Sequence, residues 1–205
     1  MKFTEREIKD LLISWVVLSL AFAILREGGI PGLVRGRFAF SPLLFFGRFI
    51  IVGTAFVLHE LSHKYVAQKY NLWAEYQRWD QGLLFAFFLS LTGLFLFAAP
   101  GAVMIRATAW ITPEIEAKTS IAGPISNIAV GIVALVIRSA GIFPSFFPGM
   151  TFFNFLTELA FINFLLALFN LFPIYPMDGS KVLRYNPMMW LVTIGTAAVL
   201  LFAAV

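Results

Sequence analysis

The only two histidines of the chain stand four residues apart in the stretch FVLHELSHKY. On an α-helix, residues i and i+4 lie on the same face, so His59 and His63 can present imidazole nitrogens to one metal ion. Glu60 follows the first histidine and lies on the adjoining edge of that face. This H-E-x-x-H spacing is typical of catalytic zinc sites, in which the glutamate takes a proton from the attacking water. We therefore predict that His59 and His63 bind one zinc ion and that Glu60 is the catalytic base.

The third zinc ligand is predicted to be a carboxylate. A catalytic zinc ion generally has three protein ligands and one open position, and the chain has no cysteine and no further histidine. Most of the acidic residues are set aside because they flank the first apolar window, lie in polar connectors or are already assigned: Glu5, Glu7, Asp10, Glu27, Glu75, Asp80, Glu114, Glu116 and Glu60. Glu158 and Asp178 remain as candidates.

Asp178 is the favoured candidate of the two. It lies in the stretch NLFPIYPMDGSK, where Pro173 and Pro176 must interrupt a helix and Gly179 leaves the backbone free. Irregular backbone at membrane depth is tolerated where it lines a site. Glu158 instead lies in a regular apolar stretch, which is typical of a packed polar residue or one that reaches the interface. An ordinary turn at the end of a membrane span is the competing interpretation of the proline and glycine cluster.

The composition indicates that these residues belong to a membrane protein. Hydrophobic residues make up 60% of the 205-residue chain and charged residues 13%, which is too apolar for an ordinary soluble domain. Six windows approach the roughly 20 apolar residues that span a bilayer: 8–25, 43–67, 82–105, 119–137, 151–172 and 187–205. We therefore predict an all-α polytopic membrane protein with about six transmembrane or re-entrant segments in one domain over residues 1–205.

The predicted ligands must meet at one depth, which restricts the path of the chain between the spans. The segment 82–118 has to leave the membrane face at which the zinc helix ends and then return to it. We predict a helix to about Ala99, a break at the following Pro-Gly pair and an extended return through residues 102–110. Whether residues 82–99 span the bilayer or re-enter it is left open. Such a return must be covered by protein or face a wet cavity.

The charge pattern bears on partners and orientation. The net charge of +4 is scattered through connectors, which favours loops beside lipid head groups and not a nucleic-acid surface. Basic residues follow the zinc helix and Asp178 on one predicted face, and a smaller group lies on the other: Lys64, Lys69, Arg78, Lys181 and Arg184, against Arg26, Arg35, Arg37 and Arg48. Because basic residues mark the cytoplasmic side, we expect a multi-pass protein of the cell membrane with a cytoplasmic N-terminus and a site nearer the cytoplasmic surface.

Three motifs together resemble the site-2 protease family of intramembrane zinc metalloproteases. They are HELSH (59–63), AGPISN (122–127) and NLFPIYPMDG (170–179), in the order that the family has. No PDZ or CBS domain is expected, so the chain resembles the minimal members. The resemblance implies that Asp178 is the third ligand of one zinc ion, that the AGPISN stretch packs at the catalytic core with Asn127 near the site, and that the substrates are transmembrane proteins.

The chain departs from the family pattern at two places. Ser180 follows the Asp-Gly pair where members often have a second glycine, and the long apolar segment 82–99 stands where a shorter membrane-associated element is expected. Without the resemblance, Gly123 and Pro124 would simply start a helix. Asn127 would then be either a structural amide between helices or a substrate contact, with equal weight.

The stretch PGAVMI, residues 100–105, is the candidate substrate-binding strand. A helical substrate must unwind before hydrolysis, and an edge strand could hold the opened chain by main-chain hydrogen bonds, as the family resemblance also suggests. A plain connector is the competing interpretation. The residues expected to line the active site or bind substrate are Asn127, Gly123, Pro124, Gly101, Ala102, Val103, Asn170 and Pro173.

The predicted function is zinc-dependent hydrolysis of peptide bonds in or near transmembrane segments by an intramembrane endopeptidase. The alternatives are a non-catalytic protein that binds transmembrane segments and holds a structural zinc, and histidines that merely hydrogen-bond between helices. Glu60 argues against a structural zinc, because a closed site needs a fourth protein ligand and no carboxylate beside the first histidine. A zinc transporter would need acidic or histidine residues along a path through the membrane. The expected partners are a transmembrane substrate and the lipid bilayer but no nucleic acid, and a homo-oligomer is left open.

Overall fold

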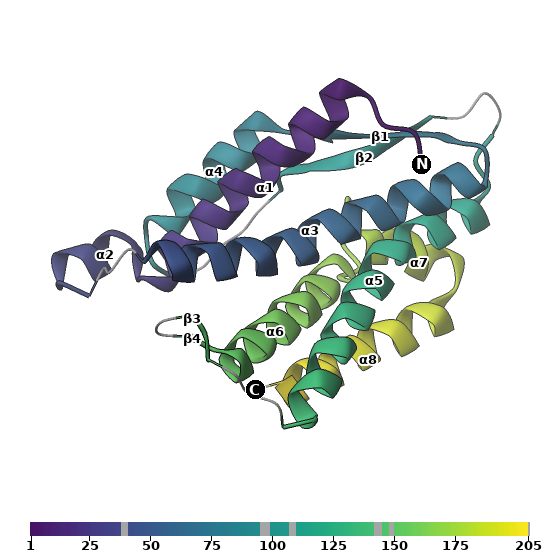
Figure 1. The fold of residues 1–205 in the computed structure, drawn as a ribbon. Helices are drawn as coiled ribbons and strands as arrows, with labels where there is room; N and C mark the ends of the chain where they lie inside the picture. The colour runs from purple at the N-terminus through teal and green to yellow at the C-terminus, as the bar shows by residue number, and fades with distance from the viewer. Residues whose placement is uncertain (38–40, 95–98, 107–109, 142–144, 148–149, 205) are drawn as a thin grey trace.

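The computed structural model describes residues 1–37, 41–94, 99–106, 110–141, 145–147 and 150–204 (Figure 1). Helices dominate the described residues, and two small antiparallel strand pairs accompany them. In chain order the elements are α1 (Glu5–Arg26), α2 (Gly29–Val34), α3 (Pro42–Lys69), β1 (Trp73–Arg78), α4 (Asp80–Ser90), β2 (Gly101–Arg106), α5 (Pro113–Ser139), β3 (Ser145–Phe147), β4 (Met150–Thr151), α6 (Phe152–Asn170), α7 (Asp178–Tyr185) and α8 (Pro187–Ala204).

Among the described residues, five helices are long and apolar enough to cross a bilayer: α1, α3, α5, α6 and α8. They confirm five of the six apolar windows. The remaining window, 82–105, overlaps α4, which has only 11 residues. Helix α4 is about 16 Å long, roughly half the thickness of a hydrocarbon core. The expected helix to Ala99 is therefore wrong, because α4 ends at Ser90; residues 95–98 of that expectation lie outside the described part of the chain.

Helix α4 ends where it meets the turn that follows α1. Gly93 has a φ of +69°, a left-handed conformation that glycine adopts easily. A Cβ on Gly93 would collide with the backbone of Gly28, and the Ile30 amide donates to the Leu91 carbonyl at 2.7 Å. This close backbone approach between two turns explains why the apolar run does not continue as a helix.

The expected extended segment after Pro100 is present as β2, and it has a partner. It pairs with β1 in an antiparallel arrangement, so the chain leaves along α4 and returns along β2 (Figure 1). The β1 strand occupies a stretch that was expected to be a polar connector. Residues 107–109, the end of the expected return, lie outside the described residues.

Gly101 opens β2 in a conformation that favours glycine. Its φ is +148°, and a Cβ at this position would collide with the carbonyl oxygen of Gln77 in β1. A larger residue would push the two strands apart, so the glycine permits the pairing.

Helix α3, which carries both histidines, lies between two layers (Figure 1). Helices α1 and α4 and the β1–β2 sheet cover one side of it, and α5 to α8 form the other side. Ile51 of α3, Ala134 of α5 and Phe164 of α6 belong to one buried apolar cluster. Gly131 of α5 lets the Phe164 ring approach closely, because a Cβ there would collide with the ring. The histidine helix is therefore held on both sides by packed side chains.

Helix α5 begins earlier than expected. Thr112 caps it by accepting a hydrogen bond from the Ile115 amide at 3.3 Å, and Pro113 follows in the first turn. The prediction that Gly123 and Pro124 start a helix is therefore wrong, because Pro124 lies inside α5. Its ring nitrogen has no hydrogen to donate to the preceding turn, so the helix is weakened beside the residues that face the histidines.

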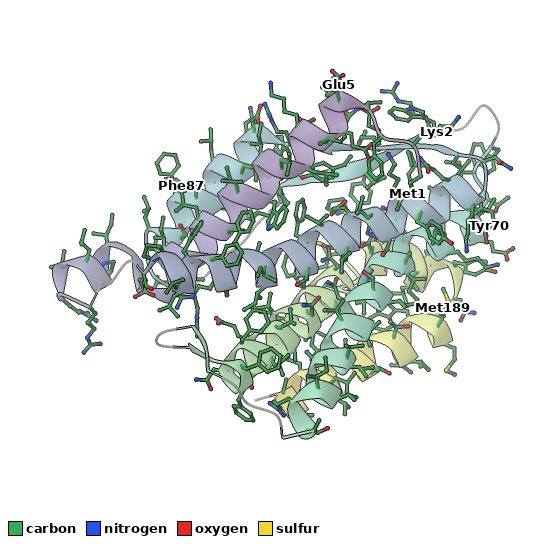
Figure 2. The ribbon with its side chains drawn as sticks, in the orientation of Figure 1. Met1, Lys2, Glu5, Tyr70, Phe87 and Met189 are labelled. Atoms are coloured by element: carbon green, nitrogen blue, oxygen red, sulfur yellow. The ribbon has the colours of Figure 1, made fainter. Side chains whose placement is uncertain are left out.

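The start of α1, the end of α3 and α7 lie at one end of the molecule, which we call the site end. Figure 2 shows Met1, Tyr70 and Met189 at this end and Phe87 towards the other, the far end. Helices α3 and α6 end at the site end, whereas α5 and α8 begin there. The end of α3, with the two histidines, and the start of α7, with Asp178, therefore lie at the same end of the molecule, as the predicted metal site requires.

Several carboxylates lie deeper than expected. Glu7 and Asp10 are buried residues of α1 and do not precede the span, and Glu75 is buried in β1. Glu7 forms a buried ion pair with Lys64 and accepts a hydrogen bond from the Tyr76 amide at 3.0 Å, which compensates for its desolvation. Lys64 is therefore buried within α3. It is not one of the basic residues at the membrane surface, contrary to what the sequence had suggested. Three other expected connector residues lie in the first turns of α4 and α5: Asp80, Glu114 and Glu116.

Candidate active site

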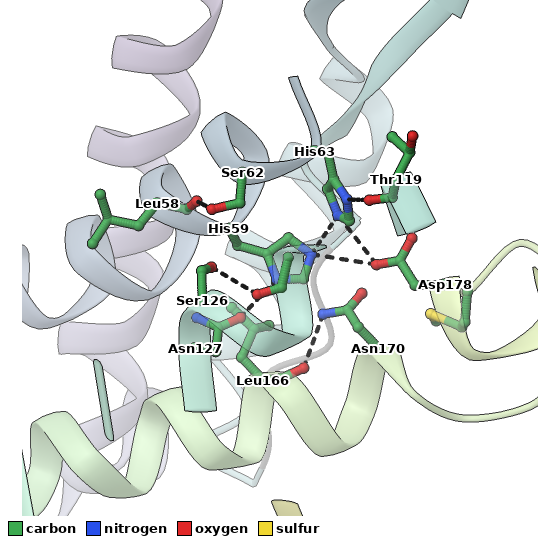
Figure 3. Close-up of polar contacts among 12 residues, drawn as sticks. Leu58, His59, Ser62, His63, Thr119, Ser126, Asn127, Leu166, Asn170 and Asp178 are labelled. Carbon is green, nitrogen blue, oxygen red and sulfur yellow. Dashed lines mark hydrogen bonds and ion pairs between the residues drawn. The ribbon is translucent and has the colours of Figure 1, made fainter. Parts of the chain in front are cut away.

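The structure brings His59, His63 and Asp178 together (Figure 3). The two histidine Nε2 atoms are 3.0 Å apart, and the Asp178 Oδ2 atom lies 3.4 Å from His59 Nε2 and 3.2 Å from His63 Nε2. In a tetrahedral zinc site with bonds of about 2.0 Å, neighbouring ligand atoms are about 3.3 Å apart. Three atoms at this spacing, two imidazole nitrogens and one carboxylate oxygen, fit a zinc ion that keeps a fourth position open.

Asp178 reaches the histidines because α7 docks on the end of α6. It is the first residue of α7, and a Cβ on the next residue, Gly179, would collide with the backbone of Leu171 just after α6. Burial by itself would raise the pKa of Asp178, but the neighbouring His63 and His59 hold that pKa below its ordinary value. The carboxylate is therefore ionised, as a metal ligand must be.

The outer nitrogens of both imidazoles have acceptors from α5. His63 Nδ1 lies 2.8 Å from the carbonyl oxygen of Thr119, which can only accept, so this nitrogen donates. His59 Nδ1 lies 2.6 Å from Asn127 Oδ1, and the Asn127 amide nitrogen donates to the Ala55 carbonyl at 2.8 Å. Both histidines are therefore protonated at Nδ1 and present the Nε2 lone pair to the shared position, which is the form that binds a metal.

Gly123 leaves room beside the two Nε2 atoms. A Cβ at this residue would lie 2.5 Å from His63 Nε2 and 2.6 Å from His59 Nε2, which is far shorter than ordinary contact. Helix α5 therefore faces the histidines with bare backbone, and Pro124 is buried next to it. A close approach of backbone to a ligand site explains the glycine better than the start of a helix does.

Glu60 is buried on α3 beside His59, and the backbone N–H of Val103 in β2 faces its carboxylate. The Tyr76 amide, opposite Val103 in the sheet, points away from β2 and donates to Glu7. Hydrogen-bonded and non-bonded pairs alternate in an antiparallel ladder, so the N–H and C=O of Val103 face outward. The free edge of β2, to which Gly101 also contributes outward-facing backbone, thus lies against Glu60.

The remaining candidates lie at different distances from the three-residue cluster. Asn170, at the end of α6, donates to the Leu166 carbonyl at 2.9 Å, and its amide lies beside the cluster (Figure 3). Pro173 is exposed in the connection between α6 and α7. Glu158, the alternative third ligand, lies on α6 about 18 Å from Asn170 along the helix axis. It forms an ion pair with Arg26 at 2.9 Å near the far end, so the structure does not bring it to the histidines.

Two residues beside the cluster were not predicted. Thr119 contributes only its backbone carbonyl, for which the sequence offers no signal. Asn163 is fully buried, with 0% of its surface accessible. Its Oδ1 accepts a hydrogen bond from Asn127 Nδ2 at 3.0 Å. An amide within an otherwise apolar span was the available signal, because such a group needs a buried partner.

Comparison with known proteins shows the family. The profile of Peptidase family M50 matches residues 140–191. The chain is 39% identical over 189 residues to MJ0611 of Methanocaldococcus jannaschii, an inferred zinc metalloprotease, with 92% of this chain and 89% of the relative covered. Zinc metalloprotease MJ0392 of the same organism is 32% identical over 137 residues, which are 66% of this chain and 33% of the relative. YwhC of Bacillus subtilis, an inferred zinc metalloprotease, is 30% identical over 167 residues, 72% of this chain and 73% of the relative.

No solved structure gives a significant match to the chain. The similarity to MJ0611 extends over nearly all of both proteins, and the His59, His63 and Asp178 group is consistent with a zinc site. Together with five helices that can cross a bilayer, these findings place the protein in the membrane. The chain belongs to peptidase family M50, the site-2 protease family, and is a membrane zinc metalloprotease.

Proposed function

We propose that the chain is an intramembrane endopeptidase that hydrolyses peptide bonds in or near transmembrane segments of other membrane proteins. The observation that carries this proposal is that the histidine pair lies within a membrane-spanning helix and not in a loop. Helix α3 ends at Lys69, so His63 lies about 9 Å inside its end at 1.5 Å per residue. Peptide bonds that reach this depth belong to transmembrane segments or to their ends.

In this proposal, His59, His63 and Asp178 hold one zinc ion. Zinc, when bound, acts as a Lewis acid and lowers the pKa of a coordinated water to about 7. Glu60 takes a proton from the attacking water and passes it to the leaving amine. Its surroundings support this role, because the Val103 N–H faces the Glu60 carboxylate and buried packing keeps that side chain in place.

The substrate is held in extended form along the free edge of β2. The backbone of Val103 faces outward beside Glu60, and the alternation of the ladder gives Gly101 and Ile105 the same direction. A peptide that adds to this edge as a further strand places its carbonyls next to the catalytic glutamate. The segment has to leave its helical conformation first, because only an unwound segment has free main-chain groups.

We also propose that the site end is cytoplasmic. Exposed or partly exposed lysines and arginines are more numerous there than at the far end: Lys2, Arg6, Lys9, Lys69, Arg78, Arg106, Lys118, Lys181 and Arg184 against Arg26, Arg35, Arg37, Arg48 and Arg138. Basic residues near the ends of spans favour the cytoplasmic side. The N-terminus then lies in the cytoplasm and the substrate bond is cut nearer that surface.

The function is tested with purified protein in proteoliposomes that also contain a panel of labelled single-span proteins, each with a Gly-Pro pair at a different depth of its span. We expect cleavage within the span by the zinc-loaded protein. Glu60→Gln keeps the shape of the side chain without its basicity, so zinc should stay bound while the cleavage rate falls at least about 100-fold. Cleavage by Glu60→Gln at the wild-type rate, or cleavage confined to loops, would contradict the proposal.

A further inference from the structure

We propose that Asn163 is a positioning residue for the metal ligand His59, and that it acts through Asn127. Neither residue touches the metal position directly; the role of Asn163 is to hold the Asn127 amide in one of its two orientations. The inference rests on the proposed function only in taking His59 as a zinc ligand.

Three hydrogen bonds link α6 to the imidazole. Asn163 Nδ2 donates to the carbonyl of Leu159, one turn earlier in α6, at 2.9 Å. Asn163 Oδ1 accepts from Asn127 Nδ2 at 3.0 Å, and Asn127 Oδ1 in turn accepts from His59 Nδ1 at 2.6 Å. The first bond is to a backbone carbonyl, which can only accept, so the direction of every later bond in the series is determined.

The two amides have no solvent to replace these bonds. Asn127 and Asn163 are both 0% exposed, and a buried polar group without a partner is unfavourable. If the Asn127 amide turned over, its oxygen would face the Ala55 carbonyl and Asn163 Oδ1, which are both acceptors. Asn163 therefore supplies one of the two contacts that keep the Asn127 oxygen turned towards His59.

The orientation of Asn127 determines the tautomer of His59. In the observed orientation, His59 donates from Nδ1 and its Nε2 lone pair is free for a metal. In the reversed orientation, the Asn127 NH2 group faces Nδ1, so the neutral imidazole must accept there and carry its proton on Nε2. A proton on Nε2 would point at Asp178 and His63 and occupy the metal position. The amide series thus selects the form of His59 that binds zinc.

Asn163→Leu tests this assignment, because leucine keeps the branched shape of asparagine without its polar atoms. We expect zinc affinity to fall about tenfold, the lower end of the range for the loss of an outer partner of a metal ligand. In the metal-free protein, 15N NMR should show a larger fraction of His59 with the proton on Nε2. Asn163→Asp in its neutral form can donate to the Leu159 carbonyl and accept from Asn127, so it should retain most of the affinity. Thr157→Val, which removes two other side-chain hydrogen bonds on α6, one to the Phe153 carbonyl and one from Arg138, should leave both measurements unchanged.

The outcomes separate this inference from the proposed zinc site. Full zinc affinity in His59→Ala refutes the site, and the inference with it. Loss of zinc in His59→Ala with wild-type affinity and tautomer in Asn163→Leu overturns the inference alone, as does an equal loss in Asn163→Leu and Thr157→Val. If Asn163→Leu does not fold, the zinc affinity of Asn163→Asp decides: an affinity near that of the wild type supports the inference, and a loss of about tenfold overturns it.

Discussion

Gly123 offers the sharpest test of the geometry, because replacing it with alanine changes no functional group. In Gly123→Ala, the new methyl carbon would lie 2.5 Å from His63 Nε2 and 2.6 Å from His59 Nε2. Ordinary contact begins near 3.4 Å, so something must move by about 0.9 Å. The methyl group belongs to the backbone of a long packed helix, whereas the imidazoles are side chains. The histidines are therefore expected to yield.

The histidines cannot move that far and keep their outer hydrogen bonds. A shift of about 0.9 Å away from Asn127 and Thr119 would lengthen contacts of 2.6 Å and 2.8 Å beyond the range of a hydrogen bond. Loss of one outer partner of a metal ligand typically lowers metal affinity about 10- to 100-fold. Because both histidines are affected, we expect zinc affinity to fall at least about 100-fold in Gly123→Ala.

Zinc affinity is measured by competition with a chelating dye, and the stability of the metal-free protein by thermal unfolding. Gly131→Ala is the matched control, since it lies on the same helix and its Cβ would collide with the Phe164 ring and not with the histidines. It should lower stability by about 1–3 kcal/mol, as overpacking does, without changing zinc affinity. Wild-type affinity in Gly123→Ala, or an equal loss of affinity in both variants, would refute the reasoning.

Two further pairs of substitutions test the third ligand and the strand. Asp178→Asn should lower zinc content much more than Glu158→Gln, since only Asp178 lies 3.2–3.4 Å from the histidine nitrogens; greater damage from Glu158→Gln would show that the wrong carboxylate was chosen. Val103→Pro removes an outward-facing N–H and should raise KM for a single-span substrate several-fold while zinc stays bound, whereas Ala102→Pro should weaken the sheet itself, because its N–H belongs to the ladder with β1. A wild-type KM in Val103→Pro would rule out the edge strand.

The sequence alone predicted the histidine pair, the proposed general base and five of the spans. His59 and His63 share a face because of the helical repeat, which is a local property that spacing reveals. The spans follow from runs of apolar residues that match bilayer thickness. Asp178 could be selected from residue types and position, because the chain offers no other His or Cys and only one further carboxylate in an apolar span.

Tertiary structure decided the groups that surround this pair. Asn127 meets His59 across 68 positions of the chain, and Glu7 meets Lys64 across 57. Strand β1 forms only because β2 returns beside it, and α4 stops at Ser90 because its end meets the turn after α1. Such contacts depend on how separate helices pack, and no local repeat encodes that packing. From the sequence, Glu7 is therefore a charge that flanks a span and Asn163 is an isolated amide. Only the packing of α1 against α3, and of α5 against α6, shows their partners.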